Sequence, residues 1–268
     1  MAHPLGCCTW IFGDEDLPAI AGRVRAAGLG GVEIHGDLSL DPALAGRVFA
    51  DQGLAIWSIT PGDADISHPD DTMRAAAVDY YLRLADWAAA TGHAPRIGCH
   101  GLVGRIRPVA TQAVEDDLLV ASVARICGAT DALVVFEILN RYESHQVRTI
   151  AEGLALLDRV GAANLRLLPD AYHMNIEEAD PAAALRTGGA AIGLYHLADS
   201  NRGAVGDGHT DFAAQFAALE AIGYDGPMIL EPAAPGPDPF NTDKGPGFRD
   251  TLGAMLARSA AAIRALGG

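Results

Sequence analysis

The sequence predicts a single (β/α)8 TIM barrel that spans residues 1–268, and three observations support this fold class. Eight short apolar runs alternate with eight amphipathic stretches, a pattern typical of parallel sheets built from βα units. Eight such strands can close into a barrel, in which every strand has two neighbours and no edge stays unpaired. The length of 268 residues, half of them hydrophobic, is close to the typical size of about 250 residues for this fold.

The expected strands are short runs of mostly apolar residues. Four runs in the first half of the chain begin near Leu5, Gly31, Leu54 and Pro95 and read LGCCTWIF, GVEIHG, LAIWSITP and PRIGCHG. Four runs in the second half read ALVVFEIL, LRLLPDAYH, IGLYHLAD and PMILEP. The expected helices between them have apolar residues at steps of three and four, and Asp41, Asp180 and Asp211 stand where N-caps are needed.

The composition excludes several classes of function. A net charge of -15 and a pI near 4.8 argue against a nucleic-acid partner, because phosphate backbones are bound by clustered Lys and Arg. The first ten residues lack the features of a secretory signal, and no apolar run is long enough to span a membrane. The four cysteines have neither zinc-site spacing nor a disulfide pattern. We therefore expect a cytoplasmic protein in which three cysteines lie in strands and Cys127 packs in a helix.

Four polar residues end the last four expected strands: Glu137, Asp170, His196 and Glu231. The carboxyl ends of barrel strands meet at one face, so these side chains can converge although they are far apart in the sequence. Three carboxylates and one imidazole form a mostly hard ligand set, which favours Mn²⁺ and also suits Mg²⁺ or Co²⁺. The sequence therefore predicts one divalent metal ion at the mouth of the barrel.

Glycine-rich and basic segments give weaker signals. The segment GLGGVEIHG leads into a strand instead of a helix, which argues against a dinucleotide site. The segment GAVGDGHTD runs into a helix and is either a flexible turn or an anion site. Arg105 and Arg107 are expected to be solvent-facing, although they could also meet an anionic end of the substrate.

Five segments of the second half resemble the xylose isomerase-like sugar isomerase/epimerase superfamily, and within it the ketose 3-epimerases of the tagatose/allulose type. They are EILNRYE, PDAYHMNIEE, HLADSNR, GHTDFAAQFAALEAIGYDG and ILEP. The resemblance implies that Glu137, Asp170, His196 and Glu231 bind the metal, and that Glu137 and Glu231 are also the catalytic acid/base pair. It further implies that Glu143, His173 and Arg202 bind substrate oxygens. From the residues alone, His173 is as well explained as a group that orients a ligand.

The side chains that surround the substrate are expected at the ends of the first four strands. We expect Trp57 and His100 to bind the substrate there, and His35 is a further candidate. Other possible walls of the pocket are Trp10, Phe12, Thr60 and Leu102. The Pro/Gly-rich segment from Pro232 to Gly247 is interpreted as a lid, a subunit contact or a plain connector.

The expected reaction is C3 epimerisation of a free ketose through a cis-enediolate, with no organic cofactor. An aldose-ketose or hydroxypyruvate-type isomerase, and a lyase or dehydratase that acts on an inosose or 3-keto-glycoside, could use the same groups. A non-catalytic subunit of a sugar-processing complex is the alternative from another class. A related DNA-repair endonuclease is disfavoured, because it would need more histidines and a basic groove. The resemblance also implies a homodimer or homotetramer.

Overall fold

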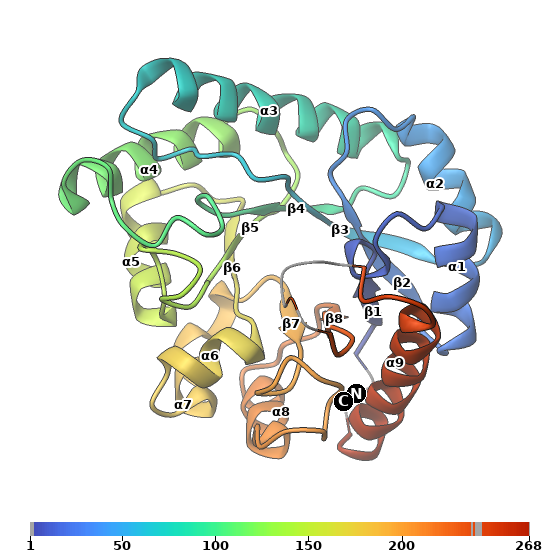
Figure 1. The fold of residues 1–268 in the computed structure, drawn as a ribbon. Coiled ribbons are helices and arrows are strands. Elements are labelled where there is room, and N and C mark those ends of the chain that lie inside the picture. The colour runs from blue at the N-terminus through green and yellow to red at the C-terminus, as the bar shows by residue number, and fades with distance from the viewer. Residues whose placement is uncertain (1–2, 237, 239–242, 268) are drawn as a thin grey trace.

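The computed structural model describes residues 3–236, 238 and 243–267, and in them strands and helices alternate along the chain (Figure 1). The strands are β1 (Leu5–Cys8), β2 (Gly31–His35), β3 (Ala55–Thr60), β4 (Arg96–Cys99), β5 (Val134–Glu137), β6 (Leu165–Leu168), β7 (Tyr195–Leu197) and β8 (Met228–Leu230). The α-helices are α1 (Leu17–Ala26), α2 (Pro42–Asp51), α3 (Asp71–Ala90), α4 (Gln112–Cys127), α5 (Ile150–Val160), α6 (Ala171–Glu177), α7 (Pro181–Gly188), α8 (Phe212–Ala221) and α9 (Phe248–Ala265). Two 3-10 turns, η1 (Trp10–Phe12) and η2 (Gly189–Ala191), complete the described elements.

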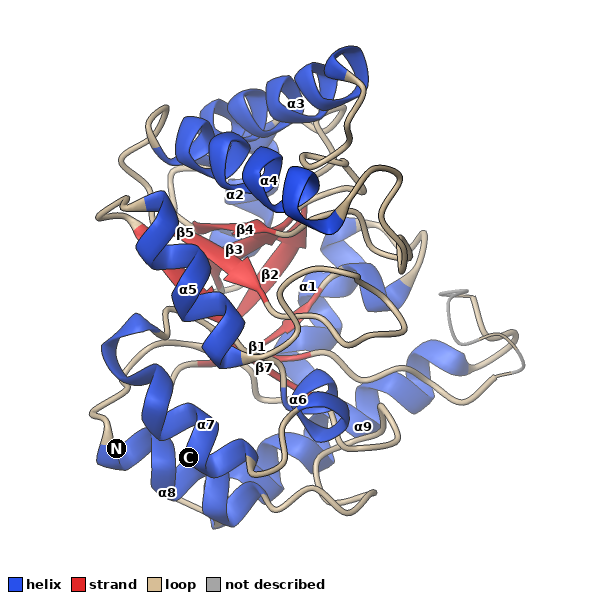
Figure 2. Ribbon diagram, turned by 90° about the vertical axis from the view of Figure 1, so that its left-hand side faces the viewer, coloured by secondary structure: helices blue, strands red, loops and turns tan. Residues whose placement is uncertain are grey.

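The strands form one parallel sheet that curls into a barrel. Its order is β6-β5-β4-β3-β2-β1-β8-β7, and the bridges Leu167–Ile192 and Asp170–His196 bring β6 next to β7. The helices lie outside the strands, as the side view shows (Figure 2). The prediction of a single-domain (β/α)8 barrel is confirmed.

The local signals explain where elements start. Asp41, Asp180 and Asp211 cap α2, α7 and α8 as predicted, each accepting a hydrogen bond from a backbone N–H in the first turn. Such a cap contributes about 1 kcal/mol. The expected strand LRLLPDAYH was too long: β6 ends at Leu168, and Asp170 caps the additional helix α6.

The core is continuous from the barrel interior to the helices. Strand residues are buried on both faces, which explains why the runs are apolar throughout instead of alternating. Cys7, Cys8 and Cys99 are buried in strands and Cys127 is buried at the end of α4, as the sequence predicts. None of the helices in the described ranges is both long and apolar enough to cross a membrane.

A register shift between β2 and β3 positions one part of the site. Val32 pairs with Ile56, but the next residue, Glu33, pairs with Ser58, so that Trp57 is the extra residue of a bulge. Bulges re-aim side chains next to functional sites. Here the shift places Ser58 beside the carboxylate of Glu33.

Candidate active site

The four polar residues that end the last strands come together at the mouth of the barrel. They are Glu137 in β5, Asp170 after β6, His196 in β7 and Glu231 after β8. All four are buried, and one potential ligand atom from each lies within 4.8 Å of those of the other three. The barrel therefore brings these four side chains together, as their positions at the ends of the strands predicted.

Three atoms of this cluster have no hydrogen-bond partner: Asp170 Oδ2, His196 Nδ1 and Glu231 Oε2. The His196 Nδ1 atom lies 3.4 Å from Glu231 Oε2 and 3.7 Å from Glu137 Oε1. Each buried polar atom without a partner costs about 1–3 kcal/mol, which a cation bound among these atoms would offset. The oxygen-rich donor set thus fits a hard divalent cation.

The pKa values of the cluster also fit a site for a cation. Burial and the neighbouring carboxylates raise the pKa of Asp170 to about 7 and that of Glu137 well above its usual range. Burial also raises the pKa of Glu231, but Arg202 and His196 outweigh it, so that this pKa is lowered. For His196, burial lowers the pKa, yet Glu33 and Glu231 raise it well above its ordinary value. Carboxyl groups are therefore crowded around the imidazole, and a bound cation would favour their charged forms.

Glu33 is a buried carboxylate that the sequence reasoning missed. It lies in β2, 1% exposed, and its Oε1 and Oε2 are 3.1 Å and 3.2 Å from His196 Nε2. Ser58 Oγ and Thr60 Oγ1 donate to it at 2.6 Å and 2.5 Å. A charged residue between the aliphatic residues Val32 and Ile34 was the available signal.

His35, which ends the same strand, was considered as a substrate contact instead. Its side chain is exposed, two residues beyond the carboxylate that faces the site. Thr60, expected as a wall of the pocket, donates its hydroxyl to Glu33. Because a strand alternates its faces, Glu33 and His35 share one side of β2, and only the deeper residue reaches the cluster.

Arg202 lies beside the four polar residues. Its Nη2 is 3.2 Å from Glu231 Oε2, and its guanidinium stacks 4.7 Å from the centre of the Tyr172 ring. The backbone of Arg202 has a φ of 56°, an unusual conformation for a residue other than glycine. Hydrogen bonds from its N–H to Asp199 O and from Ala233 N to its carbonyl hold that conformation.

His173 and Glu143 meet the same cluster through Asn140. The backbone N–H of Asn140 donates to His173 Nδ1 at 3.2 Å, and the Asn140 amide donates to Glu143 Oε1 at 3.2 Å. Nδ1 of His173 is therefore an acceptor, and the ring proton is on Nε2, 3.5 Å from Asp170 Oδ2. Burial and Arg202 lower the pKa of His173 well below its usual value, so the ring is a neutral donor. Asn140 and Tyr172 were not singled out from the sequence.

The two remaining substrate candidates differ in position. His100 is buried, its Nδ1 pairs with the carbonyl of Gly101, and burial lowers its pKa although Glu33 and Glu231 act against this. Trp57 lies at the opposite end of the barrel: a β-carbon on Gly31, the first residue of β2, would be 2.9 Å from its ring. A β-carbon on Gly6, the second residue of β1, would be 3.0 Å from the same ring, so Trp57 lies near the starts of the strands and the structure does not bring it to the cluster.

The other proposed walls of the pocket are divided between core and surface. Phe12 is fully buried in the hydrophobic core, whereas Trp10 and Leu102 are partly exposed. Positions 237 and 239–242 of the Pro/Gly-rich segment lie outside the described residues. Its described part, residues 232–236, 238 and 243–247, has no helix or strand.

The glycine-rich segment after β7 is organised by Asp199. This carboxylate accepts hydrogen bonds from the backbone N–H groups of Ser200, Gly206 and Thr210 at 2.7–3.1 Å. Asp199 thus uses two amides of this segment, and Asp211 uses the amide of Ala214 in the first turn of α8, which favours an internally bonded turn over an anion site.

Arg105 is not a solvent-facing charge. Its side chain is 11% exposed and forms ion pairs with Asp65 and Glu115, and His145 Nε2 lies 2.9 Å from the same Glu115 carboxylate. The prediction failed because the partners come from three separate segments. Arg107, by contrast, is exposed as predicted.

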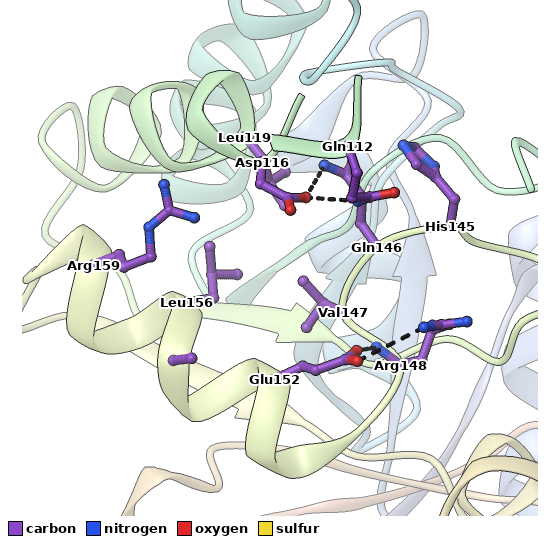
Figure 3. A pocket seen from close by; sticks show the side chains of 11 residues that line it. Gln112, Asp116, Leu119, His145, Gln146, Val147, Arg148, Glu152, Leu156 and Arg159 are labelled. Carbon is purple, nitrogen blue, oxygen red and sulfur yellow. Dashed lines mark hydrogen bonds and ion pairs between the residues drawn. The ribbon is translucent and has the colours of Figure 1, made fainter. Parts of the chain in front are cut away.

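A pocket of about 330 Å³ lies elsewhere, between α4 and α5 (Figure 3). Its polar side chains already have partners: Asp116 Oδ1 accepts from Gln112 and Gln146, Arg148 pairs with Glu152, and His145 and Arg159 pair with Glu115 and Asp117 outside the pocket. None of the residues of the carboxylate cluster lines it. The chemistry therefore belongs to the mouth of the barrel.

A second donor group at the mouth contains Cys8, His196 and Glu231. Burial and the surrounding carboxylates raise the pKa of the Cys8 thiol well above its ordinary value, which keeps it neutral. A neutral thiol is a poor ligand for a hard cation. The set with Glu137 and Asp170 is the better match.

Comparison with known proteins places this arrangement in a family. Residues 21–254 match the family described as xylose isomerase-like TIM barrel. The L-ribulose 3-epimerase of Mesorhizobium japonicum is 36% identical over 229 residues, which cover 81% of this chain and 75% of that protein. A 3-dehydro-D-guloside 4-epimerase of Escherichia coli is 33% identical over 52% of this chain and 50% of its own length. A solved structure of L-ribulose 3-epimerase superimposes with a TM-score of 0.87 at 26% identity, covering 99% of this chain and 94% of the other. The chain belongs to the xylose isomerase-like TIM barrel family, and its relatives include sugar 3-epimerases.

Proposed function

We propose that this protein is a divalent-metal-dependent epimerase that inverts C3 of a free ketose. The observation that carries the proposal is the buried group of Glu137, Asp170, His196 and Glu231, with three polar atoms lacking partners. The similarity of the chain to an L-ribulose 3-epimerase, over 81% of its length, supports the reaction class. Mn²⁺ is the first candidate for the ion, with Mg²⁺ or Co²⁺ as alternatives.

The two glutamates suit proton transfer at carbon. In the proposed mechanism, one of Glu137 and Glu231 removes the C3 proton and the other returns a proton to the opposite face. Epimerisation runs in both directions, so each glutamate has to serve as acid in one direction and as base in the other. The bound ion would supply the charge stabilisation that makes a proton next to a carbonyl acidic enough.

The neighbouring side chains would hold the sugar oxygens. His173 offers a neutral Nε2–H donor, and Arg202 offers a guanidinium fixed by Tyr172 and Glu231. Both can stabilise negative charge that develops on oxygen in an enediolate. Glu143 is an acceptor for a hydroxyl. These roles require the sugar carbonyl to lie between His173 and the two glutamates.

A second candidate is epimerisation at C4 of a 3-keto sugar, which the Escherichia coli relative favours. The site groups would be the same, because a ketone at C3 makes the C4 proton acidic. Isomerase and lyase reactions also use such groups. A non-catalytic subunit is disfavoured, because all four expected ligands are present and their donor atoms converge.

The deciding experiment is proton exchange in D₂O with Mn²⁺, on a panel of free ketoses, aldoses, inososes and 3-keto-glycosides, with Glu231→Gln as the control. Deuterium at C3 of a ketose together with its C3 epimer, lost in the control, supports the proposal. Deuterium at C4 of a 3-keto sugar would favour the second candidate. Exchange at C1 or C2 of an aldose or ketose, or loss of water, would replace the proposal by an isomerase or a dehydratase.

We also infer from the resemblance that the protein assembles as a homodimer or homotetramer in the cytoplasm and needs only its sugar and metal as partners. Light scattering coupled to gel filtration measures this directly. A monomer at micromolar concentration would contradict the inferred assembly.

A further inference from the structure

We propose that Glu33 is a positioning residue for the metal: it fixes the ring and the proton of His196 so that Nδ1 is left to bind the ion. This inference rests on the proposed metal dependence. The inference goes beyond that function, because Glu33 is not one of the candidate metal ligands. Among the described residues, it belongs to neither group whose donor atoms lie within 4.8 Å of one another.

The contacts of His196 divide the ring into two sides. Both oxygens of Glu33 lie within 3.2 Å of Nε2, whereas Nδ1 has no hydrogen-bond partner and faces Glu137 and Glu231. An imidazole that donates Nε2–H keeps the lone pair of Nδ1 for a metal ion. Glu33 therefore selects the form of the ring that can bind a cation on the side of the other ligands.

Glu33 can do this because it is itself held firmly. Its carboxylate faces Ser58 Oγ at 2.6 Å, Thr60 Oγ1 at 2.5 Å and Cys8 Sγ at 3.5 Å, in addition to His196. A carboxylate has about four acceptor positions, and four donors surround this one. The donors come from β1, β3 and β7, so the strands flanking β2 and a strand across the barrel fix its orientation.

The substitution Glu33→Gln tests the role, because it keeps the size and removes the charge. An amide has only one acceptor atom and presents NH₂ on its other side. It therefore either loses hydroxyl donors or turns NH₂ toward His196, which moves the ring proton to Nδ1. Either outcome weakens binding of the cation.

The first readout is the Kd for Mn²⁺, measured from the electron paramagnetic resonance signal of the free ion. We expect Glu33→Gln to weaken binding by about 10- to 100-fold. Histidine ¹⁵N spectra of the proteins loaded with diamagnetic Mg²⁺ give the second readout. They should show Nε2–H and a deprotonated Nδ1 on His196 in the wild type, and a changed proton position in the variant.

Glu115→Gln is the matched control. Glu115 is also a buried glutamate that contacts a histidine and accepts further hydrogen bonds, but it lies in the Arg105 network. The substitution should lower the free energy of unfolding and leave the Kd for Mn²⁺ within about twofold of the wild-type value. Glu33→Asp should regain part of the affinity, because the charge returns.

The outcomes separate this inference from the proposed function. A wild type that binds no Mn²⁺ overturns both. A wild type that binds Mn²⁺ while Glu33→Gln binds equally well, or loses no more affinity than Glu115→Gln, overturns only the role of Glu33. If Glu33→Gln does not fold, Thr60→Val decides. That variant should lose about three- to tenfold in Mn²⁺ affinity, since one hydrogen bond to Glu33 is removed, and an unchanged Kd would reject the inference.

Discussion

Two buried polar clusters lie near the carboxyl ends of the strands, and they differ in what their atoms without a hydrogen bond face. In the first, Arg105 lies between Asp65 and Glu115, and the two atoms that lack a hydrogen bond, Arg105 Nε and Asp65 Oδ2, form an ion pair with each other at 2.8 Å. In the second, Glu137, Asp170 and Glu231 surround a single imidazole, and three atoms have no hydrogen-bond partner. A cluster whose charges compensate one another holds loops together. A cluster whose unpartnered atoms are two carboxylate oxygens and an imidazole nitrogen offers free lone pairs to a cation that the chain does not supply.

The largest difference should follow from removing a charge in the second cluster. Glu137→Gln should lower the rate of epimerisation by about 10²- to 10⁴-fold, because one of two proton-transfer groups is lost. In the metal-free protein its stability should change little, since burial raises the pKa of Glu137 and the amide resembles the neutral acid. Initial rates and urea unfolding measure the two effects. A variant that lost stability but kept its rate would contradict the comparison.

Removing the central charge of the first cluster should lower the stability and leave the metal affinity unchanged. Arg105→Met leaves Asp65 and Glu115 buried without their cation and should cost about 3–5 kcal/mol of unfolding free energy. The Mn²⁺ Kd of the folded variant should stay at the wild-type value. Denaturant unfolding and a metal titration below the unfolding transition check this. A strong loss of metal affinity would show that the two clusters are not independent.

Chelation should act on the second cluster alone. At a Mn²⁺ concentration 100 times its Kd, binding stabilises the native state by about 2.7 kcal/mol, and EDTA should remove that amount together with the activity. Arg105→Met should show the same metal-dependent increment on a lower baseline. Thermal unfolding with and without EDTA gives both numbers. An increment of zero in the wild type would reject a metal site in the second cluster.

The smallest effect is expected at the edge of the second cluster. Tyr172→Leu removes the ring that stacks on Arg202 and should cost about 0.5–1 kcal/mol of interaction, because the guanidinium is partly exposed. We expect a severalfold higher KM for the sugar with kcat and Mn²⁺ affinity almost unchanged. Steady-state kinetics at saturating Mn²⁺ distinguish this from a general loss. Equal losses in kcat and kcat/KM would mean that Tyr172 acts in the transition state.

The sequence predicted the barrel and its polar strand ends because those signals are local. Glu137 and Glu231 each follow an apolar run directly, so the end of the strand and the polar group are read together. Glu33 was missed because its significance depends on His196, 163 positions away, which only the closed barrel brings near. Trp57 was misplaced because its ring lies beside Gly6 and Gly31 near the starts of β1 and β2, and the sequence of a short strand does not show toward which end of the barrel a side chain points.

Asp170 illustrates how tightly helix and site are joined. One of its oxygens accepts the Tyr172 N–H at 2.7 Å and starts α6, while the other points without a partner toward the cluster. Asparagine would keep the start of the helix and lose the charge, whereas glutamate would keep the charge and fit the cap poorly. The same atoms also set where His173 sits, one turn further on in α6. Two requirements therefore restrict which residue can stand at position 170: it has to cap α6, and it has to offer a carboxylate to the site. Each of the two substitutions meets one requirement and fails the other.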